Sequence, residues 1–392
     1  MRVLVAHVAY QYRGGEEVVV EMEARLLREA GHAVSTLVVP SSDFYGLPRL
    51  EQVRIGLNMG DHPYGRALIR AAVKEHHPDV VHFHNLYPLL GVGAMAEAAA
   101  LGCAVVRTLH NFRLSCIAGT HFRNGQTCNL CTAARHTSGV LRACYRGSRI
   151  QSAAMARACV TEWRFASQEA IPHVTICVSD FLLRHMTERG YPAARLHLKP
   201  NSVERGRPYA HRERRGACFV GRLSVEKGVL PLVESWPVEA PPLTIVGDGP
   251  LRGEVEQASA AKKNVVFAGP RSAEDVRQLI RSSRVAIVSS LCYETSHLVT
   301  IEAFSEGTPV ASFSRGALQE HMRSQGFEDI ALGDFAGLVS QAAALCEADE
   351  QTWSECSSRA LGIHRAKYSH EKNLAALTEV YEAALATARE RR

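Results

Sequence analysis

The sequence predicts an α/β protein with two doubly wound, Rossmann-like domains. Short runs rich in Val, Ile and Leu alternate with longer amphipathic stretches, a pattern typical of a parallel sheet with helices on both faces. The pattern begins again after residues 196–216, a polar stretch rich in Pro, Gly and Arg. The chain has 392 residues, of which 46% are hydrophobic, so it is long enough for two separate cores.

Each strand expected in the first half is a short apolar run followed by a turn or a helical pattern. The first is "RVLVAHV", and the amphipathic stretch after it stops at Gly31. The runs cover residues 2–8, 34–39, 80–84, 105–109 and 174–178.

In the second half, strands are expected at "ACFVG", "LTIVG", "NVVFAG", "VAIVSS" and "PVASF". We place a first domain at residues 1–198, a second at 199–372 and a terminal helix at 373–392. Open α/β sheets bind ligands beyond the carboxyl ends of their strands, so the cleft between two such domains is the expected active site.

The charge and composition restrict the class of protein. A formal net charge of +5 is too small to indicate nucleic acid as a partner, but it suits an anionic ligand or a membrane surface. No signal-peptide pattern and no apolar run of about 18 residues is evident, so we expect a cytoplasmic protein. In that compartment the eleven cysteines are expected to be thiols or metal ligands rather than disulfides.

Glycines and cations follow strands at positions suited to a phosphate. Gly14 and Gly15 precede a helix, where the backbone can approach a phosphate at the helix N-terminus. A plain strand-to-helix turn explains the same pair, and this segment lacks the G-x-G-x-x-G fingerprint. Arg222 and Lys227 place two cations on one loop, which suits a diphosphate; two solvated surface charges are the alternative.

Two glutamates with seven residues between them flank the start of a helix in "YETSHLVTIEAFSEGTP". Glu294 lies in the loop after a strand, and Glu302 lies about two turns into a helix expected to begin near Ser296. The backbone amides between them include those of His297, Leu298 and Val299. Two carboxylates for a sugar and a ribose, with amides for a diphosphate, match the parts of a sugar nucleotide. A capping carboxylate and a surface glutamate are the alternative interpretation.

These motifs stand in the order seen in the retaining glycosyltransferases of family four, which the sequence resembles from Arg2 to about Ser312. The matching segments are "GGEE", "TLHN", "VSDF", "PNSV", "GRLSVEKG", "IVGDGP" and "YETSHLVTIEAFSEGTPVAS". The E-x7-E pattern preceded by R-x4-K is specific, whereas the glycine pairs are not. The resemblance implies the GT-B fold, in which two Rossmann-like domains face each other across a donor cleft. It also implies that the C-terminal helix packs back on the first domain.

The resemblance also implies roles for single residues. Glu294 would bind hydroxyls of the transferred sugar and Glu302 the donor ribose. Arg222 and Lys227 would neutralise the leaving diphosphate, to which Gly15 would donate its amide. His110, at the end of the "AVVRTLH" strand, would lie against the reacting sugar, although a histidine satisfied in the interior is the alternative.

The expected reaction is sugar transfer from a nucleotide-diphosphate sugar, UDP-linked, with retention of configuration. Cations and amides aimed at the diphosphate stabilise the charge that develops as the glycosyl–phosphate bond breaks. No Asp-x-Asp metal clamp is evident, so no catalytic metal is expected. The family usually has Phe-Gly or a similar pair where this chain has Ser296-His297, which puts the donor sugar in doubt. The alternatives are a sugar-nucleotide epimerase, a phosphorylase or a non-catalytic sugar-nucleotide-binding protein.

A cysteine-rich insertion at about residues 112–148 contains four thiols spaced for a zinc knuckle. They are Cys116, Cys128, Cys131 and Cys144, and the middle pair is C-x2-C. A structural zinc would fold such a long loop, whereas free thiols and disulfides are the alternatives.

An arginine-rich stretch runs from Arg135 to Arg164, and its one acidic residue is Glu162. It suits peripheral contact with anionic lipid at the inner face of a membrane, or a phosphorylated acceptor; a solvated helix face is the alternative. A small molecule, a lipid-linked saccharide and a polymer all stay open as the acceptor.

Overall fold

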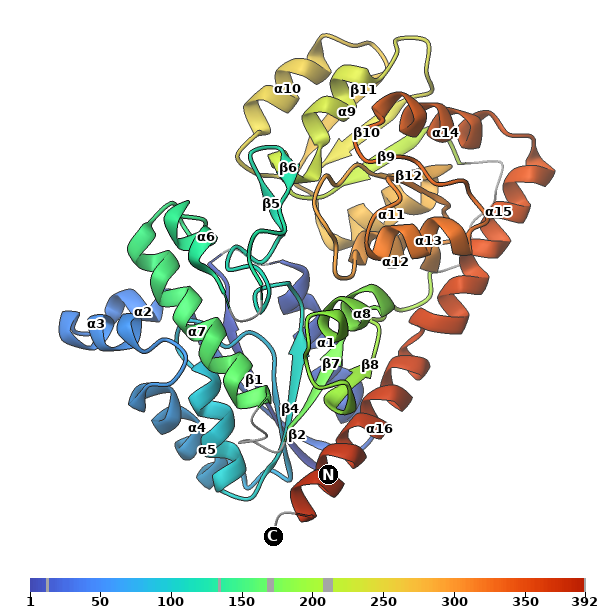
Figure 1. The fold of residues 1–392 in the computed structure, drawn as a ribbon. Coiled ribbons are helices and arrows are strands. Elements are labelled where there is room, and N and C mark those ends of the chain that lie inside the picture. The colour runs from blue at the N-terminus through green and yellow to red at the C-terminus, as the bar shows by residue number, and fades with distance from the viewer. Residues whose placement is uncertain (12–13, 133–134, 168–172, 207–213, 391–392) are drawn as a thin grey trace. The chain divides into compact units, whose positions relative to one another are not determined.

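The computed structural model describes residues 1–11, 14–132, 135–167, 173–206 and 214–390, and it divides into two compact units (Figure 1). Unit 1 comprises Met1–His121, Cys128–Asn201 and Asn373–Arg392, and unit 2 comprises Phe122–Thr127 and Ser202–Lys372. Each unit holds one parallel sheet covered by helices on both faces, which confirms the predicted two-domain α/β fold.

Unit 1 is built on a six-stranded parallel sheet in the order β2-β1-β3-β4-β7-β8. Its strands are β1 (Arg2–Ala9), β2 (Ala33–Pro40), β3 (Val80–Phe83), β4 (Ala104–Leu109), β7 (His173–Cys177) and β8 (Leu196–Leu198). Successive residues of β1 enter opposite cores: Leu4 and Ala6 pack on one face and Val3 and Val5 on the other. Burial on both faces is why these strands form continuous apolar runs in the sequence.

The helices of unit 1 form two layers. Those of the first layer include α3 (Arg49–Leu57), α4 (Pro63–His76), α5 (Gly91–Ala100) and α7 (Arg149–Ser167), which pack on the Leu4 face. The opposite face is covered by α1 (Gly15–Glu29) and by α16 (His370–Arg389) through Leu377, Val380 and Tyr381. The remaining helices are α2 (Asp43–Gly46), α6 (Thr137–Leu141), α8 (Asp180–Glu188) and η1 (Ala193–Arg195).

Unit 2 holds a five-stranded parallel sheet in the order β11-β10-β9-β12-β13. Its strands are β9 (Ala217–Val220), β10 (Leu243–Val246), β11 (Val265–Gly269), β12 (Val285–Val288) and β13 (Val310–Ser312). Helices α9 (Val229–Ser235), α10 (Arg252–Ala260) and α14 (Phe335–Glu347) pack on one face. The other face is covered by α11 (Ala273–Ser282), α12 (Leu298–Ser305) and α15 (Glu350–Ile363). Also present are η3 (Val225–Lys227), α13 (Ala317–Ser324) and the π-helix η4 (His364–Tyr368).

The two sheets differ in strand order, which decides where each has its topological switch point. In unit 1 the order reverses between β1 and β3, and in unit 2 it reverses between β9 and β12. Ligands of open α/β sheets bind outside the carboxyl ends of the strands at such a point. Each unit therefore has one preferred location for a site.

Two features of the fold differ from the sequence prediction. The edge strand β8 lies within the stretch interpreted as a polar linker, and the division between the units falls at Asn201–Ser202, three residues after the expected boundary. In the Cys-rich insertion, the hairpin of β5 (Phe122–Arg123) and β6 (Gln126–Thr127) groups with unit 2. There Arg315 donates to the hydroxyl of Thr127 at 3.0 Å.

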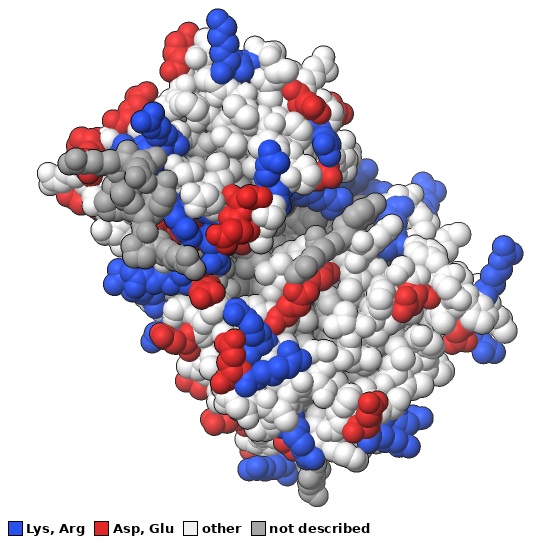
Figure 2. Space-filling model, turned by 180° about the vertical axis from the view of Figure 1, so that it is seen from behind, with Lys and Arg blue, Asp and Glu red and all other residues white. Residues whose placement is uncertain are grey.

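No helix in the described ranges has the length and apolar character needed to cross a bilayer. On the face drawn in Figure 2, basic and acidic side chains are interspersed, as expected for a chain with a net charge of only +5.

Candidate functional site

The switch point of unit 2 brings together Lys227 and Glu294, which are 67 residues apart in the chain. Lys227 ends η3, in the loop after β9, and Glu294 lies in the loop after β12. The Lys227 Nζ atom donates to Glu294 Oε1 at 2.6 Å, and Ser290 Oγ donates to the same oxygen at 2.6 Å. The side chains are 23% and 12% exposed, so the pair is open to solvent on one side.

Backbone contacts hold these two loops together. Gly228 has φ +64°, and a Cβ there would lie 2.2 Å from the carbonyl oxygen of Ser289, so only glycine permits this approach. Leu291 N donates to Glu226 O at 2.8 Å, and Ser289 Oγ donates to Lys227 O at 2.9 Å. The relative position of Lys227 and Glu294 is thus fixed by the backbone as well as by their own contact.

The pKa shifts of the pair are those of an ion pair. Burial alone would raise the pKa of Glu294, but Lys227, His297 and the hydrogen bond from Ser290 outweigh it and lower the pKa. Burial would lower the pKa of Lys227, and Glu294 outweighs it and raises the pKa. Both groups are therefore charged at neutral pH.

Helix α12 begins beside this pair. It starts at Leu298 with His297 as its N-cap residue, so Ser296 lies one residue before the cap and not at it. Leu298 and Val299 form the first turn, whose amides have no acceptor within the helix. His297 is 8% exposed and its Nδ1 lies 3.2 Å from Thr300 Oγ1. Burial lowers its pKa to about 4, so the ring is neutral at pH 7.

Glu302 lies on α12, one helical turn before Glu306. Burial raises its pKa, Arg277 lowers it and the nearby Glu306 raises it further. Glu306 is 4% exposed and accepts from Arg281 at 2.8 and 3.2 Å, which makes it a structural anchor of this helix.

Arg222 follows β9 on the same loop as Lys227, and its side chain is exposed. The neighbouring "IVGDGP" turn packs on this loop, since Leu223 N donates to Asp248 O at 2.9 Å. The loop backbone is thus fixed while the guanidinium reaches solvent.

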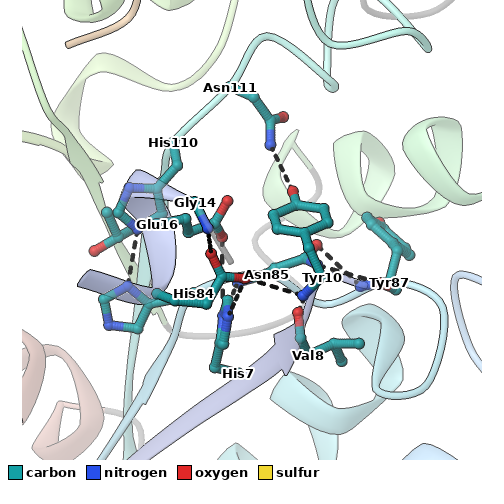
Figure 3. Close-up of polar contacts among 12 residues, drawn as sticks. His7, Val8, Tyr10, Gly14, Glu16, His84, Asn85, Tyr87, His110 and Asn111 are labelled. Atoms are coloured by element: carbon teal, nitrogen blue, oxygen red, sulfur yellow. Dashed lines mark hydrogen bonds and ion pairs between the residues drawn. The ribbon is translucent and has the colours of Figure 1, made fainter. Parts of the chain in front are cut away.

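In unit 1, His110 follows β4 and stacks on His84, which follows β3 (Figure 3). Nε2 of His110 lies 2.8 Å from Nδ1 of His84, and the two rings are inclined by 16°. Burial, Arg107 and Lys199 all lower the pKa of His110 well below its usual value. Burial and the neighbouring histidines do the same to His84, so both rings are neutral.

Gly14 and Gly15 stand at the start of α1, at the other side of the unit 1 switch point. Gly14 is the N-cap residue, and its N–H donates to Glu17 Oε2 at 2.8 Å. The other oxygen of Glu17 accepts from Tyr10 N at 2.9 Å. Burial opposes ionisation of Glu17, but His7 and these backbone donors outweigh it and lower its pKa to about 2. Tyr12 and Arg13 lie outside the described residues.

Beside His110 lies a small polar cavity of about 10 Å³, room for about one water. Its lining includes Glu16, Arg107, Arg113 and Glu162. Arg107 Nε donates to Glu162 Oε1 at 3.1 Å, and Tyr87 donates to Oε2 at 2.6 Å. A larger cavity of about 540 Å³ lies at the amino ends of β1, β3 and β4, away from the switch point, so we assign it no site.

Beneath His84 lies a fully buried lysine–glutamate pair, Lys199 with Glu23. The ligand atoms of Glu23, His82 and His84 lie within 4.8 Å of one another, a separation that suits a metal. However, the nitrogens of His82 contact Tyr381 Oη at 2.9 Å and Thr108 Oγ1 at 2.7 Å. With Lys199 already supplying the positive charge, these residues fit a hydrogen-bonded network better than a metal.

The four cysteines of the insertion form no disulfides, and two of them, Cys131 and Cys144, lie beside Gly139. Cys116 and Cys131 are buried, and Cys128 and Cys144 are half-buried. A Cβ on Gly139 would lie 3.2 Å from Cys131 Sγ, and Gly139 O accepts from Cys144 N at 2.9 Å. Burial raises the pKa of Cys131, and the other three thiols add to this. In the described ranges no three of these thiols lie within 4.8 Å of one another, whereas zinc would hold them about 4 Å apart.

Sequence reasoning missed His7, Glu23, His84 and Lys199. Each could have been noticed in the sequence, because each is an ionisable residue in or beside a strand or helix face that is otherwise apolar. That these four residues form one cluster could not be predicted, because only the strand order brings them together.

Two family models match the chain. Residues 13–207 match "Glycosyltransferase Family 4", and residues 214–348 match "Glycosyl transferases group 1". A curated relative, "Uncharacterized glycosyltransferase MJ1607" of Methanocaldococcus jannaschii, is 32% identical over 114 residues, which is 27% of this chain. The match spans only 29% of the length of that relative.

Solved structures share the fold along the whole chain. Anabaena HepE in complex with UDP has a TM-score of 0.64 at 16% identity, covering 98% of this chain and 100% of that one. Sucrose-phosphate synthase from Thermosynechococcus elongatus has a TM-score of 0.68 at 15% identity, covering 98% and 99%. At such identities these structures establish the GT-B architecture of the chain.

Proposed function

The chain is a glycosyltransferase of the GT-B fold, and from this premise we propose that it transfers a sugar from a UDP-linked donor with retention of configuration. The observation that carries sugar transfer from a nucleotide-diphosphate sugar is the Lys227–Glu294 pair beside the first turn of α12. A cation, a carboxylate and helix N-terminal amides at one switch point match the chemistry of a diphosphate joined to a sugar.

Binding of the donor would replace the contact between Lys227 and Glu294 by contacts of each residue with the donor. Without it, Lys227 and Glu294 neutralise each other at 2.6 Å. A diphosphate would take Lys227 and the exposed Arg222, while sugar hydroxyls would donate to Glu294. Because the pair is already charged and fixed by backbone contacts, its groups need little rearrangement to stabilise the leaving diphosphate. Glu302 would receive the ribose hydroxyls.

On unit 1 we assign His110 to the reacting sugar and Gly15 to the diphosphate. Both stand at carboxyl ends of strands beside the β1–β3 switch point. A neutral His110 offers one donor and one acceptor, which suits a sugar hydroxyl. Burial and the nearby positive charges of Arg107 and Lys199 oppose protonation of His110, which is why its pKa is well below the usual value.

The choice of UDP and of retention rests on relatives. HepE was crystallised with UDP and with UDP-glucose, and the family resemblance implies front-face attack with the leaving phosphate as the base. The geometry of the Lys227–Glu294 pair suits any nucleotide-diphosphate sugar and either stereochemical outcome. Thermal unfolding against a panel of UDP-, GDP- and ADP-sugars tests the donor: one present at 100 times its Kd adds about 2.7 kcal/mol. NMR of the product anomer tests retention, and an inverted anomer would refute it.

For the acceptor we propose a lipid-linked saccharide, reached from an anionic membrane. A basic–apolar surface supports this choice, formed by Tyr45, Leu50, Val53, Leu57, Leu141 and Ile150 with Arg142, Arg146, Arg149 and Arg157, all exposed. Arg146 donates to Tyr45 Oη at 2.7 Å and Arg157 to Asn58 Oδ1 at 3.0 Å, so the turn before α7 contacts α2, and α7 contacts the residue after α3. Exposed aliphatic side chains beside arginines are typical of interfacial contact.

We also propose that the four cysteines bind a structural zinc once their thiols contract around it. The effect of the other three thiols on the pKa of Cys131 supports this, since it requires all three to lie near Cys131. Metal analysis of protein purified without chelators is the test, with Cys131→Ser as the ligand variant and Cys218→Ser as the buried control. Less than about 0.1 zinc per chain would refute the proposal.

A further inference from the structure

A chain of buried polar contacts runs from Glu23 on α1 through His84 to His110. His84 is completely buried, and its two ring nitrogens face different partners. Nδ1 lies 2.8 Å from Nε2 of His110, whereas Nε2 lies 3.8 Å from Oε2 of Glu23. In the described residues neither Nε2 of His84 nor Oε2 of Glu23 has a hydrogen-bond partner, so these two buried atoms face each other.

The other oxygen of Glu23 is held by Lys199. Both side chains are at most 1% exposed, and Lys199 Nζ donates to Glu23 Oε1. The carboxylate is therefore kept in place by an ammonium group on one side and turns its second oxygen to His84. An ionised carboxylate has only acceptor oxygens, so it favours a proton on the nitrogen that faces it.

A neutral imidazole carries a single N–H, and this fixes the rest of the chain. If Nε2 of His84 holds the proton, Nδ1 of His84 is an acceptor and Nε2 of His110 must be the donor at 2.8 Å. The opposite arrangement would set the lone pair of His84 against the carboxylate of Glu23. Figure 3 shows the His84–His110 contact that transmits this choice.

We propose that Glu23 and His84 are positioning residues that fix His110 as the Nε2–H tautomer, with Nδ1 as its acceptor. This inference rests on the proposed function, in which His110 contacts the reacting sugar. His110 would then accept a hydrogen bond from a sugar hydroxyl rather than donate one. A sugar nucleotide offers hydroxyl donors at the transferred ring, so an acceptor nitrogen is the matching group.

The test is imidazole ¹⁵N NMR of the whole protein labelled at histidine, assigned with His84→Gln and His110→Gln. The unchanged protein should show His84 and His110 both as Nε2–H tautomers at pH 7.5. If His110 is instead the Nδ1–H tautomer, the proposal is overturned. This measurement needs neither a substrate nor a Glu23 variant.

Glu23→Gln sharpens the test. Its amide oxygen can keep accepting from Lys199 while its NH₂ group donates to Nε2 of His84. His84 should then become Nδ1–H and His110 Nδ1–H as well. Glu29→Gln, an exposed glutamate of the same helix, is the matched control and should leave both tautomers unchanged. An unchanged His110 tautomer in folded Glu23→Gln refutes the positioning role.

Kinetics separate this inference from the proposed function. Glu23→Gln should lower kcat at least about tenfold while changing the donor KM less than about twofold, since the charged groups assigned to the diphosphate, Arg222 and Lys227, lie on unit 2. If no sugar nucleotide reacts with the unchanged protein, the proposed function fails while the tautomers can still be read. If the tautomers switch and kcat does not fall, the role of Glu23 in catalysis is refuted.

Discussion

Among the described residues, each unit contains a lysine–glutamate pair assembled from distant parts of the chain, and the two pairs differ in burial. In unit 1, Lys199 and Glu23 are 176 residues apart and at most 1% exposed. In unit 2, Lys227 and Glu294 are 67 residues apart and 23% and 12% exposed. A pair without access to solvent cannot exchange its partner for a ligand, whereas a pair at an open strand end can. We therefore expect the first pair to stay intact during the reaction, holding the fold and keeping Glu23 in place beside His84, and the second pair to exchange its contacts for those of the donor.

The largest effect is expected from breaking the buried pair. Lys199→Met leaves Glu23 as an uncompensated buried charge, which should destabilise the protein by about 3–5 kcal/mol in guanidinium unfolding. Lys227→Met should cost less stability, because the Glu294 carboxylate keeps the hydrogen bond from Ser290 and some solvent.

The double variant Glu23→Gln/Lys199→Met is the control for the buried charge, and it should recover part of the lost stability. Equal destabilisation by Lys199→Met and Lys227→Met would remove the distinction between the two pairs.

The next effect concerns the rate of transfer. Lys227→Met and Glu294→Gln should each lower kcat on the order of a hundredfold, about 3 kcal/mol, by removing a group that stabilises the diphosphate or holds the sugar. Initial rates at saturating donor check this, with folding verified by circular dichroism. Lys263→Met, an exposed lysine of unit 2, should retain full activity. Full activity in Glu294→Gln would refute the proposed site.

Buried neutral histidines make stability depend on pH in both units. Burial lowers the pKa of His185 in unit 1 and of His321 in unit 2 to about 3, against about 6.5 when unfolded. Each therefore contributes stability in full above pH 6.5, and this is lost as pH falls toward 3, by about 1.4 kcal/mol per pH unit.

His321→Gln should lower by about one the number of protons taken up when unit 2 unfolds, and so reduce the slope of its unfolding free energy against pH. Guanidinium unfolding between pH 6.5 and 4.5, followed by Trp236 and Trp353 in a Trp163→Phe background, measures the slope. His185→Gln should leave the unit 2 slope as it is. A slope unaffected by His321→Gln would mean that this histidine is charged in the folded state.

The smallest effect per residue is expected on the surface of unit 1. Replacing Arg142 and Arg149 by Gln should weaken binding to vesicles with 30% anionic lipid by about 1 kcal/mol, or fivefold, per arginine. The difference should shrink as salt is raised to about 0.5 M. Lys263 and Arg271 of unit 2, replaced in the same way, should have no effect. Equal losses from both pairs would show non-specific attraction, and no binding at all would refute the membrane proposal.

The fold could be predicted because buried parallel strands form apolar runs that are visible without an alignment. The edge strand β8 escaped because its three residues, Leu196–Leu198, stand in a polar stretch and pair on one side only. The helix expected near Ser296 begins at Leu298, within the usual uncertainty of a helix start.

The candidate site was harder to predict from the sequence than the fold, and the part in unit 1 was harder to predict than the part in unit 2. Lys227 and Glu294 each lie in the loop directly after a strand, where a ligand is expected, and the structure places them 2.6 Å apart. The Glu23–His84–His110 chain joins a helix to the ends of two strands, and its members have no characteristic spacing. Its recognition needed the strand order and the side-chain directions, which only the structure supplies.

Helix α16 packs on one face of the unit 1 sheet, whose strands are synthesised long before this helix. Tyr381 covers His82, and Leu377 and Val380 pack on the sheet of unit 1. A ribosome must therefore synthesise residues 373–389 before this first-made sheet is covered, while the sequence of the unit made later is already complete at Lys372. Nascent chains stalled near residue 372 should expose strands such as β1 to protease. Resistance of those strands at that stage would show that the sheet is protected without its last helix.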